Sequence, residues 1–194
     1  MALSADAVVP RLRGRFGRPY LFVERCASTQ RLLDADAPEG AVVVADEQTE
    51  GRGRLGRRWE AKPGTSILCS IALLPRVPQE RLPELSLVAG AACADAIRTV
   101  TGLEPSLKFP NDVLIGERKV AGILAEAREG RVVLGVGINV NVSAEDLPAD
   151  TQTPATSLSV ETGRPIDRTG MLVALLDALE QRYDAWTIGL GSRS

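Results

Sequence analysis

The residues best suited to chemistry lie in one glycine- and arginine-rich segment, residues 51–59, which reads Gly-Arg-Gly-Arg-Leu-Gly-Arg-Arg-Trp. Between Arg52 and Lys62 the chain carries five cationic side chains and one anionic side chain. Glycines let the backbone approach a ligand closely, and guanidinium groups form paired hydrogen bonds with carboxylates and phosphates. The segment therefore predicts an anion-binding loop. Because its arginines repel one another when the loop is empty, we expect it to become ordered when the anion binds.

Other interpretations of this segment are possible. It fits the pattern G-x-G-x-x-G, and the apolar run 42–44 before it is typical of a strand, which makes a dinucleotide-binding fold an alternative. The residues after Gly56 do not open a helix, as that fold requires, and no Gly-Lys-Ser/Thr sequence closes a P-loop. From this segment alone, a solvated basic loop and a nucleic-acid-binding patch remain open.

The composition of the chain narrows these choices. The 194 residues are 44% hydrophobic and 25% charged, which is typical of one soluble globular domain. The net charge of −2 argues against nucleic-acid binding by the domain as a whole. Histidine is absent, which excludes Ser-His and Cys-His catalysis and His-ligated zinc. The positive charge of residues 51–59 is therefore expected to serve a small anion.

The cysteines and the terminal segments bear on location. Cys26, Cys69 and Cys93 are far apart in the sequence, so we interpret them as small buried residues in a reducing compartment. The N-terminus has no signal-peptide pattern and no apolar run reaches membrane-spanning length. We therefore expect a cytoplasmic protein without a membrane contact. Residues 1–187 are expected to form the domain, and residues 188–194 a disordered or truncated tail.

Several polar residues outside the loop are candidates for ligand binding. Ser28 and Thr29 precede a helix expected over residues 31–37, so one hydroxyl caps that helix and the other is free for a polar ligand. Gln48 offers one acceptor and two donors, the complement of a cyclic urea or amide. Lys108, in an expected strand, is either paired with a carboxylate or aimed at the same anion as the loop.

The segment 131–141 is the most informative of the expected strands. Alternation puts Val132 and its apolar neighbours on one face and Gly135, Gly137 and Asn139 on the other. Glycine weakens a strand, so two glycines on one face indicate that something approaches the backbone closely. We expect this face to form the floor of a ligand site, with Asn139 contacting a polar ring or a phosphate.

The remaining elements form a scaffold around these residues. Further strands are expected at 21–23, 41–45, 65–74 and 106–115, the last broken by the turn residues 110–112 and followed by a hairpin partner at 118–126. Helices are expected at 83–101 and after Asp167, whose side chain caps the second one. The residues between, 143–165, have the composition of a loop.

Four segments together resemble the catalytic domain of biotin protein ligases: residues 28–30, Gln48 with 51–59, 108–112 with 119–124, and 135–140. They occur in the family's order, which makes the resemblance more specific than any one motif. It implies an α+β fold, a mixed β-sheet flanked by helices and related to class II aminoacyl-tRNA synthetases. It also implies that the carboxylate of biotin attacks ATP to give biotinyl-5′-AMP, from which biotin passes to a lysine of a biotin carboxyl carrier protein.

The resemblance assigns roles residue by residue. The biotin-binding residues would be Ser28, Thr29, Gln30, Gln48, Arg52, Gly53, Arg54 and Lys108. Arg52, Arg54 and Asn139 would bind the nucleotide, and Lys108 and Arg54 would be catalytic. Mg²⁺ would accompany ATP on its phosphates, without a ligand set in the chain itself.

The sequence also departs from the family pattern. Phe109 stands where many relatives have Trp, and Gln30 where Asn is common. Neither an N-terminal helix-turn-helix domain nor a C-terminal β-barrel domain is recognisable, so no DNA binding is expected. The carrier protein of acetyl-CoA carboxylase or another biotin-dependent carboxylase is the expected partner, and a homodimer is possible. A lipoate ligase, a module that binds biotin or its adenylate without turnover, and an NAD-dependent oxidoreductase are the alternatives.

Overall fold

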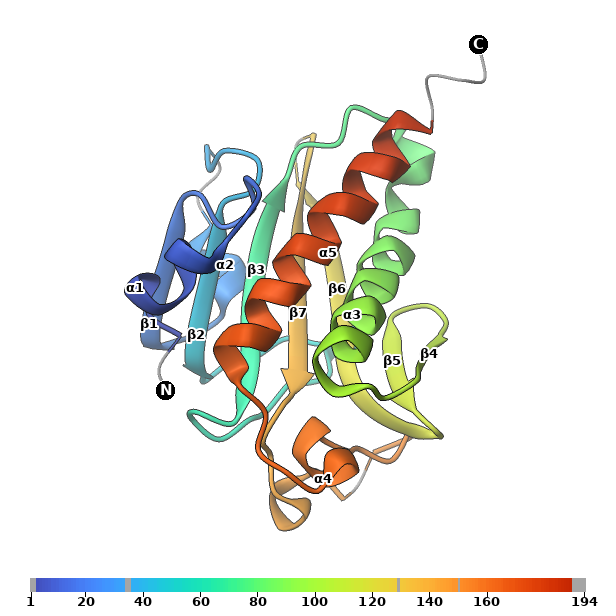
Figure 1. The fold of residues 1–194 in the computed structure, drawn as a ribbon. Helices are drawn as coiled ribbons and strands as arrows, with labels where there is room; N and C mark the ends of the chain where they lie inside the picture. Colours follow the sequence, from blue (N-terminus) through green and yellow to red (C-terminus); the bar gives the residue numbers. More distant parts are fainter. Residues whose placement is uncertain (1–2, 34–35, 129, 150, 190–194) are drawn as a thin grey trace.

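The computed structural model describes residues 3–33, 36–128, 130–149 and 151–189, and these form a seven-stranded sheet with helices packed against it (Figure 1). The strand order is β1-β2-β3-β7-β6-β5-β4. The strands are β1 (Tyr20–Cys26), β2 (Val42–Gln48), β3 (Ser66–Leu73), β4 (Pro105–Lys108), β5 (Asp112–Ile115), β6 (Arg118–Arg128) and β7 (Arg131–Asn139). Strands β1 and β2 are parallel and the other neighbours are antiparallel, so the predicted mixed sheet is confirmed.

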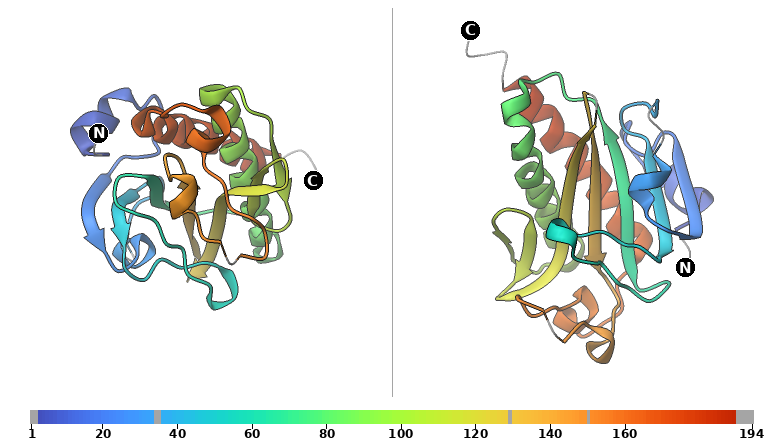
Figure 2. Two further views of the ribbon diagram at one scale, coloured as in Figure 1. Left: turned by 90° about the horizontal axis from the view of Figure 1, so that it is seen from below. Right: turned by 180° about the vertical axis from the view of Figure 1, so that it is seen from behind.

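Two long helices, α3 (Leu85–Thr101) and α5 (Arg168–Ile188), cover one face of the sheet (Figure 1). The other helices are short: α1 (Ala5–Val8), α2 (Thr29–Leu32) and α4 (Leu158–Thr162). Seen from behind, the opposite face of the sheet carries no long helix, and the loop that follows β2 passes across it (Figure 2). One face of the sheet is therefore available for a ligand site.

The alternation predicted for residues 131–141 explains why the two faces differ. Leu134, Val136 and Ile138 are buried in the core beneath α3 and α5. Gly135 and Gly137 point to the opposite face, because successive residues of a strand alternate between faces. Strand β7 lies in the middle of the sheet between β3 and β6, so its glycine face becomes the centre of the uncovered side.

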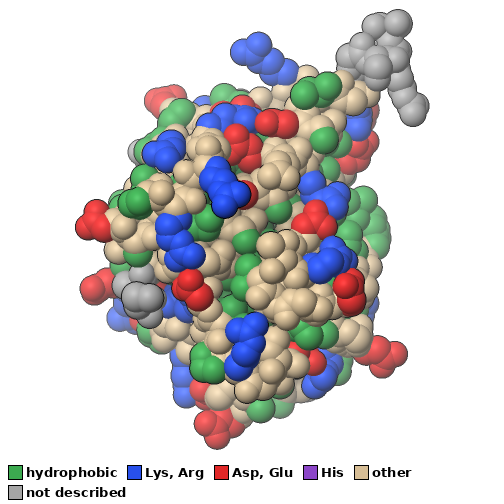
Figure 3. All heavy atoms as spheres, in the orientation of Figure 1, with side chains coloured by type: hydrophobic (Ala, Val, Ile, Leu, Met, Phe, Trp, Pro, Cys, Tyr) green, Lys and Arg blue, Asp and Glu red, His purple; other side chains and the backbone are tan. Residues whose placement is uncertain are grey.

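The helix-covered surface mixes charges of both signs. Lys and Arg side chains alternate with Asp and Glu over this face, without an extended patch of one sign among the coloured residues (Figure 3). Ion pairs such as Arg81–Glu84 and Arg182–Asp95 account for part of the mixture. This face therefore gives no support to a nucleic-acid-binding surface.

The structure corrects several expected boundaries. The helix expected over 31–37 is α2, which ends at Leu32, and residues 34 and 35 lie outside the described part. The strand expected to end at residue 45 continues to Gln48, because β2 pairs with β1 over its whole length. Helix α4 lies inside the expected loop 143–165, where Ser157 accepts a hydrogen bond from the amide of Val160 and caps it.

The ends of the two long helices differ less from expectation. A 3-10 turn over 79–84 precedes α3, which therefore begins two residues after Pro83. The side chain of Asp167 accepts a hydrogen bond from Thr169 and caps α5 as predicted. Ile188, assigned to a tail, is the last residue of α5, and residues 190–194 lie outside the described part of the chain.

Candidate active site

A cleft of about 780 Å³ lies on the side of the sheet that α3 and α5 leave uncovered. This volume is in the range of small-molecule and cofactor sites. All of the site residues predicted from the sequence line the cleft: Ser28, Thr29, Gln30, Gln48, Arg52, Gly53, Arg54, Lys108 and Asn139. They come from α2, the end of β2, the loop after it, β4 and β7, so only the folded chain brings them together.

A buried polar group forms one end of the cleft. Gln48 Oε1 accepts hydrogen bonds from the amide of Thr29 at 2.7 Å and from its hydroxyl at 3.1 Å. The Thr29 hydroxyl also lies 2.7 Å from the hydroxyl of Ser70. The amide nitrogen of Gln48 has no hydrogen-bond partner within the described residues, so it is a free donor.

The capping role predicted for Ser28 or Thr29 is wrong. Ser28 occupies the N-cap position of α2, but its side chain makes no capping hydrogen bond. The Thr29 hydroxyl is directed to Gln48 and Ser70 instead. Both residues are almost fully buried, so their hydroxyl groups lie within the wall of the cleft.

Two side chains lie on the glycines of β7 and close part of the expected ligand floor. A Cβ atom at Gly137 would come within 2.6 Å of the Trp59 ring, and one at Gly135 within 3.1 Å of Gln30 Nε2. Gln30 Nε2 also donates to the carbonyl oxygen of Leu124 at 3.2 Å. The close approach predicted from the glycines is thus made, within the chain, by Trp59 and Gln30.

The glycine- and arginine-rich segment folds back on itself as a tight hairpin. The Gly53 amide donates to the Arg57 carbonyl at 2.8 Å, and the Trp59 amide donates to the Gly51 carbonyl at 3.0 Å. Leu55 and Gly56 turn the chain with φ values of 58° and 74°. No helix follows, which confirms that the G-x-G-x-x-G pattern is not a dinucleotide fingerprint here.

The arginines of this hairpin are held to different degrees. Arg52 pairs with Glu126 of β6 at 3.0 Å, and Arg128 also pairs with that carboxylate at 2.9 Å. Arg57 donates to Gln152 Oε1 at 3.0 Å. Arg54 makes no ion pair or hydrogen bond through its side chain within the described residues, so its guanidinium group is free for an anion.

Lys108 faces the hairpin from β4 and is exposed. Within the described residues it is not paired with a carboxylate, and its ammonium group donates to the hydroxyl of Thr153 at 2.8 Å. Asp112 lies opposite Lys108 in the β4–β5 register, but its carboxylate pairs with Lys119 at 2.7 Å. The structure therefore supports the second interpretation of Lys108, a cation directed at the cleft.

Asn139 is buried, and its amide nitrogen donates to the carbonyl oxygen of Thr156 at 3.0 Å. Asn141 makes two hydrogen bonds with the backbone of Ile166. Asn139 thus attaches the segment around Thr156 to the sheet, and Asn141 attaches the segment before α5 to the chain just after β7. The nucleotide contact expected of Asn139 stays a prediction.

Cations and neutral polar groups outnumber carboxylates in the cleft, and among the described residues of its wall no thiol is activated as a nucleophile. Burial raises the pKa of the Cys69 thiol to about 12, so this cysteine of the cleft wall is a thiol at neutral pH. In the described part of the chain, no three His, Cys, Asp or Glu side chains are grouped so as to hold a metal ion. Cys93 is buried as expected, whereas Cys26 is only half-buried. The arrangement suits charge stabilisation on a bound substrate.

Sequence reasoning missed four residues that contact the predicted site residues or the arginine-rich loop 51–59: Ser70, Glu126, Gln152 and Thr153. Ser70 had a local signal, because a serine interrupts an otherwise apolar strand. The other three are ordinary surface residues in the sequence. Their partners lie between 45 and 95 positions away, beyond the reach of any local pattern.

Comparison with known proteins agrees with the class of protein that this fold and site define. Residues 22–143 match the model of the Biotin/lipoate A/B protein ligase family, which is more than half of the chain. The chain belongs to that family. Within the described residues, no helix has the length and apolar character needed to cross a membrane.

Individual relatives lie on the biotin side of this family. The Bifunctional ligase/repressor BirA of Bacillus spizizenii is 40% identical over 176 residues, which are 86% of this chain and 54% of that protein. The Biotin--[acetyl-CoA-carboxylase] ligase of Mycobacterium tuberculosis is 40% identical over 152 residues, 76% of this chain and 56% of that protein. The chain therefore spans about half the length of the curated relatives it matches.

A solved structure shows the same fold. The biotin protein ligase from Aquifex aeolicus in complex with biotin and ATP matches with a TM-score of 0.79 and 35% identity. The match covers 87% of this chain and 71% of that one. The predicted α+β fold of the biotin protein ligases is thereby confirmed.

Proposed function

We propose that this chain catalyses the ATP-dependent activation of biotin and its transfer to a lysine of a biotin carboxyl carrier protein. The observation that carries this proposal is the meeting, in one cleft, of the arginine hairpin, Lys108 and the polar group around Gln48. The hairpin and Lys108 supply cationic donors, and the polar group supplies fixed hydrogen bonds. Family membership and the similarity to biotin-binding relatives support the same reaction.

In the first step, a carboxylate oxygen of biotin attacks the α-phosphorus of ATP. A bond forms between oxygen and phosphorus, the bond to the β-phosphate breaks, and pyrophosphate leaves. Negative charge develops on the phosphoryl oxygens, so cationic donors that face it lower the barrier. We assign this role to Lys108 and Arg54, whose cationic groups have no carboxylate partner in the described part of the chain.

In the second step, the amine of the acceptor lysine attacks the carbonyl carbon of biotinyl-5′-AMP. An amide forms and AMP leaves. Charge now develops on the carbonyl oxygen, which the same cations would stabilise. Neither step needs a protein nucleophile, which agrees with the absence of histidine from the chain and with the raised pKa of Cys69.

Biotin would bind at the buried polar end of the cleft. Its ureido ring presents two N–H donors and one carbonyl acceptor, and the hydroxyls of Ser28 and Thr29 with the Gln48 amide offer complementary groups. A lipoyl ring has no such donors, so it would leave this buried group unsatisfied. The polar end therefore favours biotin over lipoate.

The remaining components follow from ATP as a substrate. Mg²⁺ would neutralise the phosphates and be held chiefly by phosphate oxygens and water, as is usual for this ion. Arg52, Gly53 and Asn139 would contact the nucleotide and the activated carboxylate. We place the reaction in the cytoplasm, where ATP is available, and a homodimer stays a prediction to be measured by sedimentation.

The decisive experiment is biotin-dependent exchange of labelled pyrophosphate into ATP, with lipoate as the control and no carrier protein. Exchange with biotin alone is the expected result, and transfer of biotin to a purified carrier protein then tests the second step. Exchange with lipoate instead would indicate a lipoate ligase. Biotin binding in a calorimeter without exchange would mean a binding module and would reject the proposal.

A second prediction concerns the hairpin formed by residues 51–59. If it closes over the adenylate, biotin with ATP will slow amide hydrogen exchange at Gly53, Arg57 and Trp59, because local opening becomes costly. Exchange in the buried part of α3 serves as the internal reference. Equal exchange in the hairpin with and without ligands would contradict this closing role.

A further inference from the structure

Lys108 has an unusual partner for a cation in a cleft. Its ammonium group donates to the hydroxyl of Thr153 at 2.8 Å, and this is its only hydrogen bond within the described residues. A lysine side chain has four rotatable bonds, so an exposed ammonium group without a partner would occupy many positions. The Thr153 hydroxyl restricts it to one arrangement.

The carboxylate opposite Lys108 in the sheet is paired with another cation. Asp112 is the cross-strand partner of Lys108, yet its carboxylate pairs with Lys119 of β6 at 2.7 Å. Lys119 also lies 5.5 Å from the centre of the Trp59 ring, which adds a second contact to its position. Among the described residues, Lys108 is thus oriented by a neutral hydroxyl and has no paired anion to compensate its positive charge.

Thr153 itself is carried by an anchored segment. The amide of Lys119 donates to the carbonyl of Pro154 at 2.7 Å, and the amide of Thr156 donates to the carbonyl of Lys119 at 2.8 Å. Thr156 is fully buried, which fixes the segment to the edge of β6. Because threonine is branched at Cβ, its hydroxyl has few available directions. The segment can therefore hold that hydroxyl in place.

We propose that Thr153 is a positioning residue for Lys108. Its hydroxyl oxygen accepts one N–H of the ammonium group and leaves the other two N–H groups for the anion in the cleft. Thr153 itself does not touch the substrate. This inference rests on the proposed function and adds to it the residue that orients the charge-stabilising lysine.

The first test compares two substitutions at this position in the pyrophosphate exchange assay. Thr153→Val keeps the shape but removes the hydroxyl, and it should lower kcat about tenfold, a factor that one hydrogen bond to a charged group supports. The KM for biotin should change little, because Thr153 acts through the charge that develops during the reaction. Thr153→Ser keeps the hydroxyl and should recover most of the rate.

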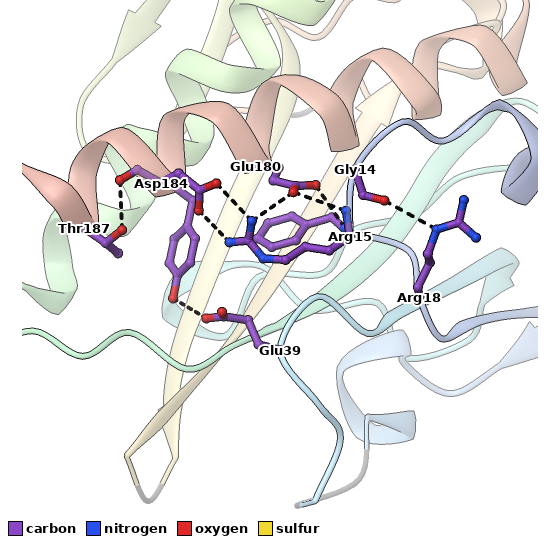
Figure 4. A network of polar contacts seen from close by, with 9 residues as sticks. Gly14, Arg15, Arg18, Glu39, Glu180, Asp184 and Thr187 are labelled. Carbon is purple, nitrogen blue, oxygen red and sulfur yellow. Dashed lines mark hydrogen bonds and ion pairs between the residues drawn. The ribbon is translucent and has the colours of Figure 1, made fainter.

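Thr187→Val is the matched control. It also replaces a threonine hydroxyl that makes one hydrogen bond, in this case to the carbonyl of Asp184 near the end of α5. The residue lies on the helix-covered side, in the polar network of Figure 4. Wild-type kinetics are expected, and circular dichroism confirms that each variant is folded.

A double-mutant cycle separates positioning from a general structural role. In a Lys108→Ala background, Thr153→Val should have no further effect, because the group that it positions is gone. A tenfold loss in that background, or a wild-type rate for Thr153→Val alone, would overturn the inference while leaving the proposed function intact. A wild-type chain without any biotin-dependent exchange would instead refute the proposed function, and the role of Thr153 with it.

Discussion

At the scale of single residues, some cations of the cleft are paired with carboxylates and others are not. Arg52 and Lys119 are paired with Glu126 and Asp112, so much of their charge is compensated. Within the described residues, Lys108 has only a neutral hydroxyl as a partner and Arg54 has none. A charge without a paired anion is available to a substrate that carries the opposite charge.

This division predicts a large effect of removing Lys108. Lys108→Ala should lower the rate of biotin-dependent pyrophosphate exchange by about 10²- to 10³-fold, the usual cost of losing one donor that stabilises developing charge. Lys62→Ala is the matched control, because Lys62 is an exposed lysine paired with Asp146. A variant without Lys108 that exchanges pyrophosphate at the wild-type rate would remove this lysine from the mechanism.

At the scale of elements, the glycines of β7 determine where the hairpin rests. Trp59, the last residue of the hairpin, lies on Gly137, and the space for its ring exists because that position has no Cβ atom. Gly122 of β6 and Gly137 together form a shelf under the Trp59 ring, because a Cβ atom built at Gly122 would lie 2.8 Å from that ring. The hairpin can thus pack closely on the sheet because Gly137 and Gly122 have no side chains.

A substitution on this shelf should displace the indole. In a Trp186→Phe background Trp59 is the only tryptophan, since the chain has two. Gly137→Ala should then shift its emission to longer wavelength, because a Cβ atom 2.6 Å from the ring forces it toward water. At Gly135 the nearest atom is the end of the flexible Gln30 side chain, so Gly135→Ala should leave the emission unchanged. Identical spectra for all three proteins would contradict this packing.

At the scale of the whole molecule, the two ends of the described chain support one another. Arg15, near the N-terminus, pairs with Glu180 and Asp184 of α5 (Figure 4). The hydrogen bond from Arg15 lowers the pKa of Asp184, so this carboxyl stays ionised at neutral pH. Phe16 is 1% exposed and packs against Tyr183 with ring centres 5.7 Å apart. The N-terminal segment is thus part of the core that supports the sheet.

The N-terminal packing can be tested through the free energy of unfolding. Phe16→Ala should lower it by about 3–5 kcal/mol, the usual cost of removing a buried aromatic side chain. Phe109→Ala makes the same change at a residue that is 78% exposed, and it should change the unfolding free energy by less than about 0.5 kcal/mol. Equal effects of the two substitutions in urea denaturation would show that the N-terminal segment does not belong to the core.

A pH-dependent contact joins the start of α3 to the end of α5. Glu84 accepts hydrogen bonds from Arg81 and from the Trp186 indole, which lower its pKa from 4.5 to about 2. Because the folded-state pKa is depressed, the contribution of this carboxylate is complete above about pH 4.5 and is lost as the pH falls toward 2. In Glu84→Gln the fall in unfolding free energy over this acid range should be smaller than in the wild type.

The matched control for the acid range is Glu117→Gln, because Glu117 is exposed and its side chain makes no ion pair or hydrogen bond in the described part of the chain. Its acid dependence should follow that of the wild type. Both variants are measured by urea denaturation at several pH values. If Glu84→Gln also follows the wild type, the contact contributes nothing to acid stability.

The sequence could predict most of the elements and the members of the site for identifiable reasons. Strict alternation of apolar residues with Gly135 and Gly137 indicated a strand with one face in the core, as found. Apolar spacing and the Asp167 cap indicated α5. The length of α2 was overestimated, because extended backbone at Leu33 ends the helix after Leu32. Local propensity is a weak guide for such short elements.

What the sequence determined by itself was the chemistry: the arginine-rich loop, Lys108, and the hydroxyl and amide groups of Ser28, Thr29 and Gln48 are visible as residue types. Only the tertiary structure decided their partners. Lys108 contacts a threonine instead of the carboxylate opposite it, and Trp59 fills the glycine shelf. The physical reason is that composition and periodicity act along the chain, whereas the partner of a polar group depends on which distant segments pack beside it.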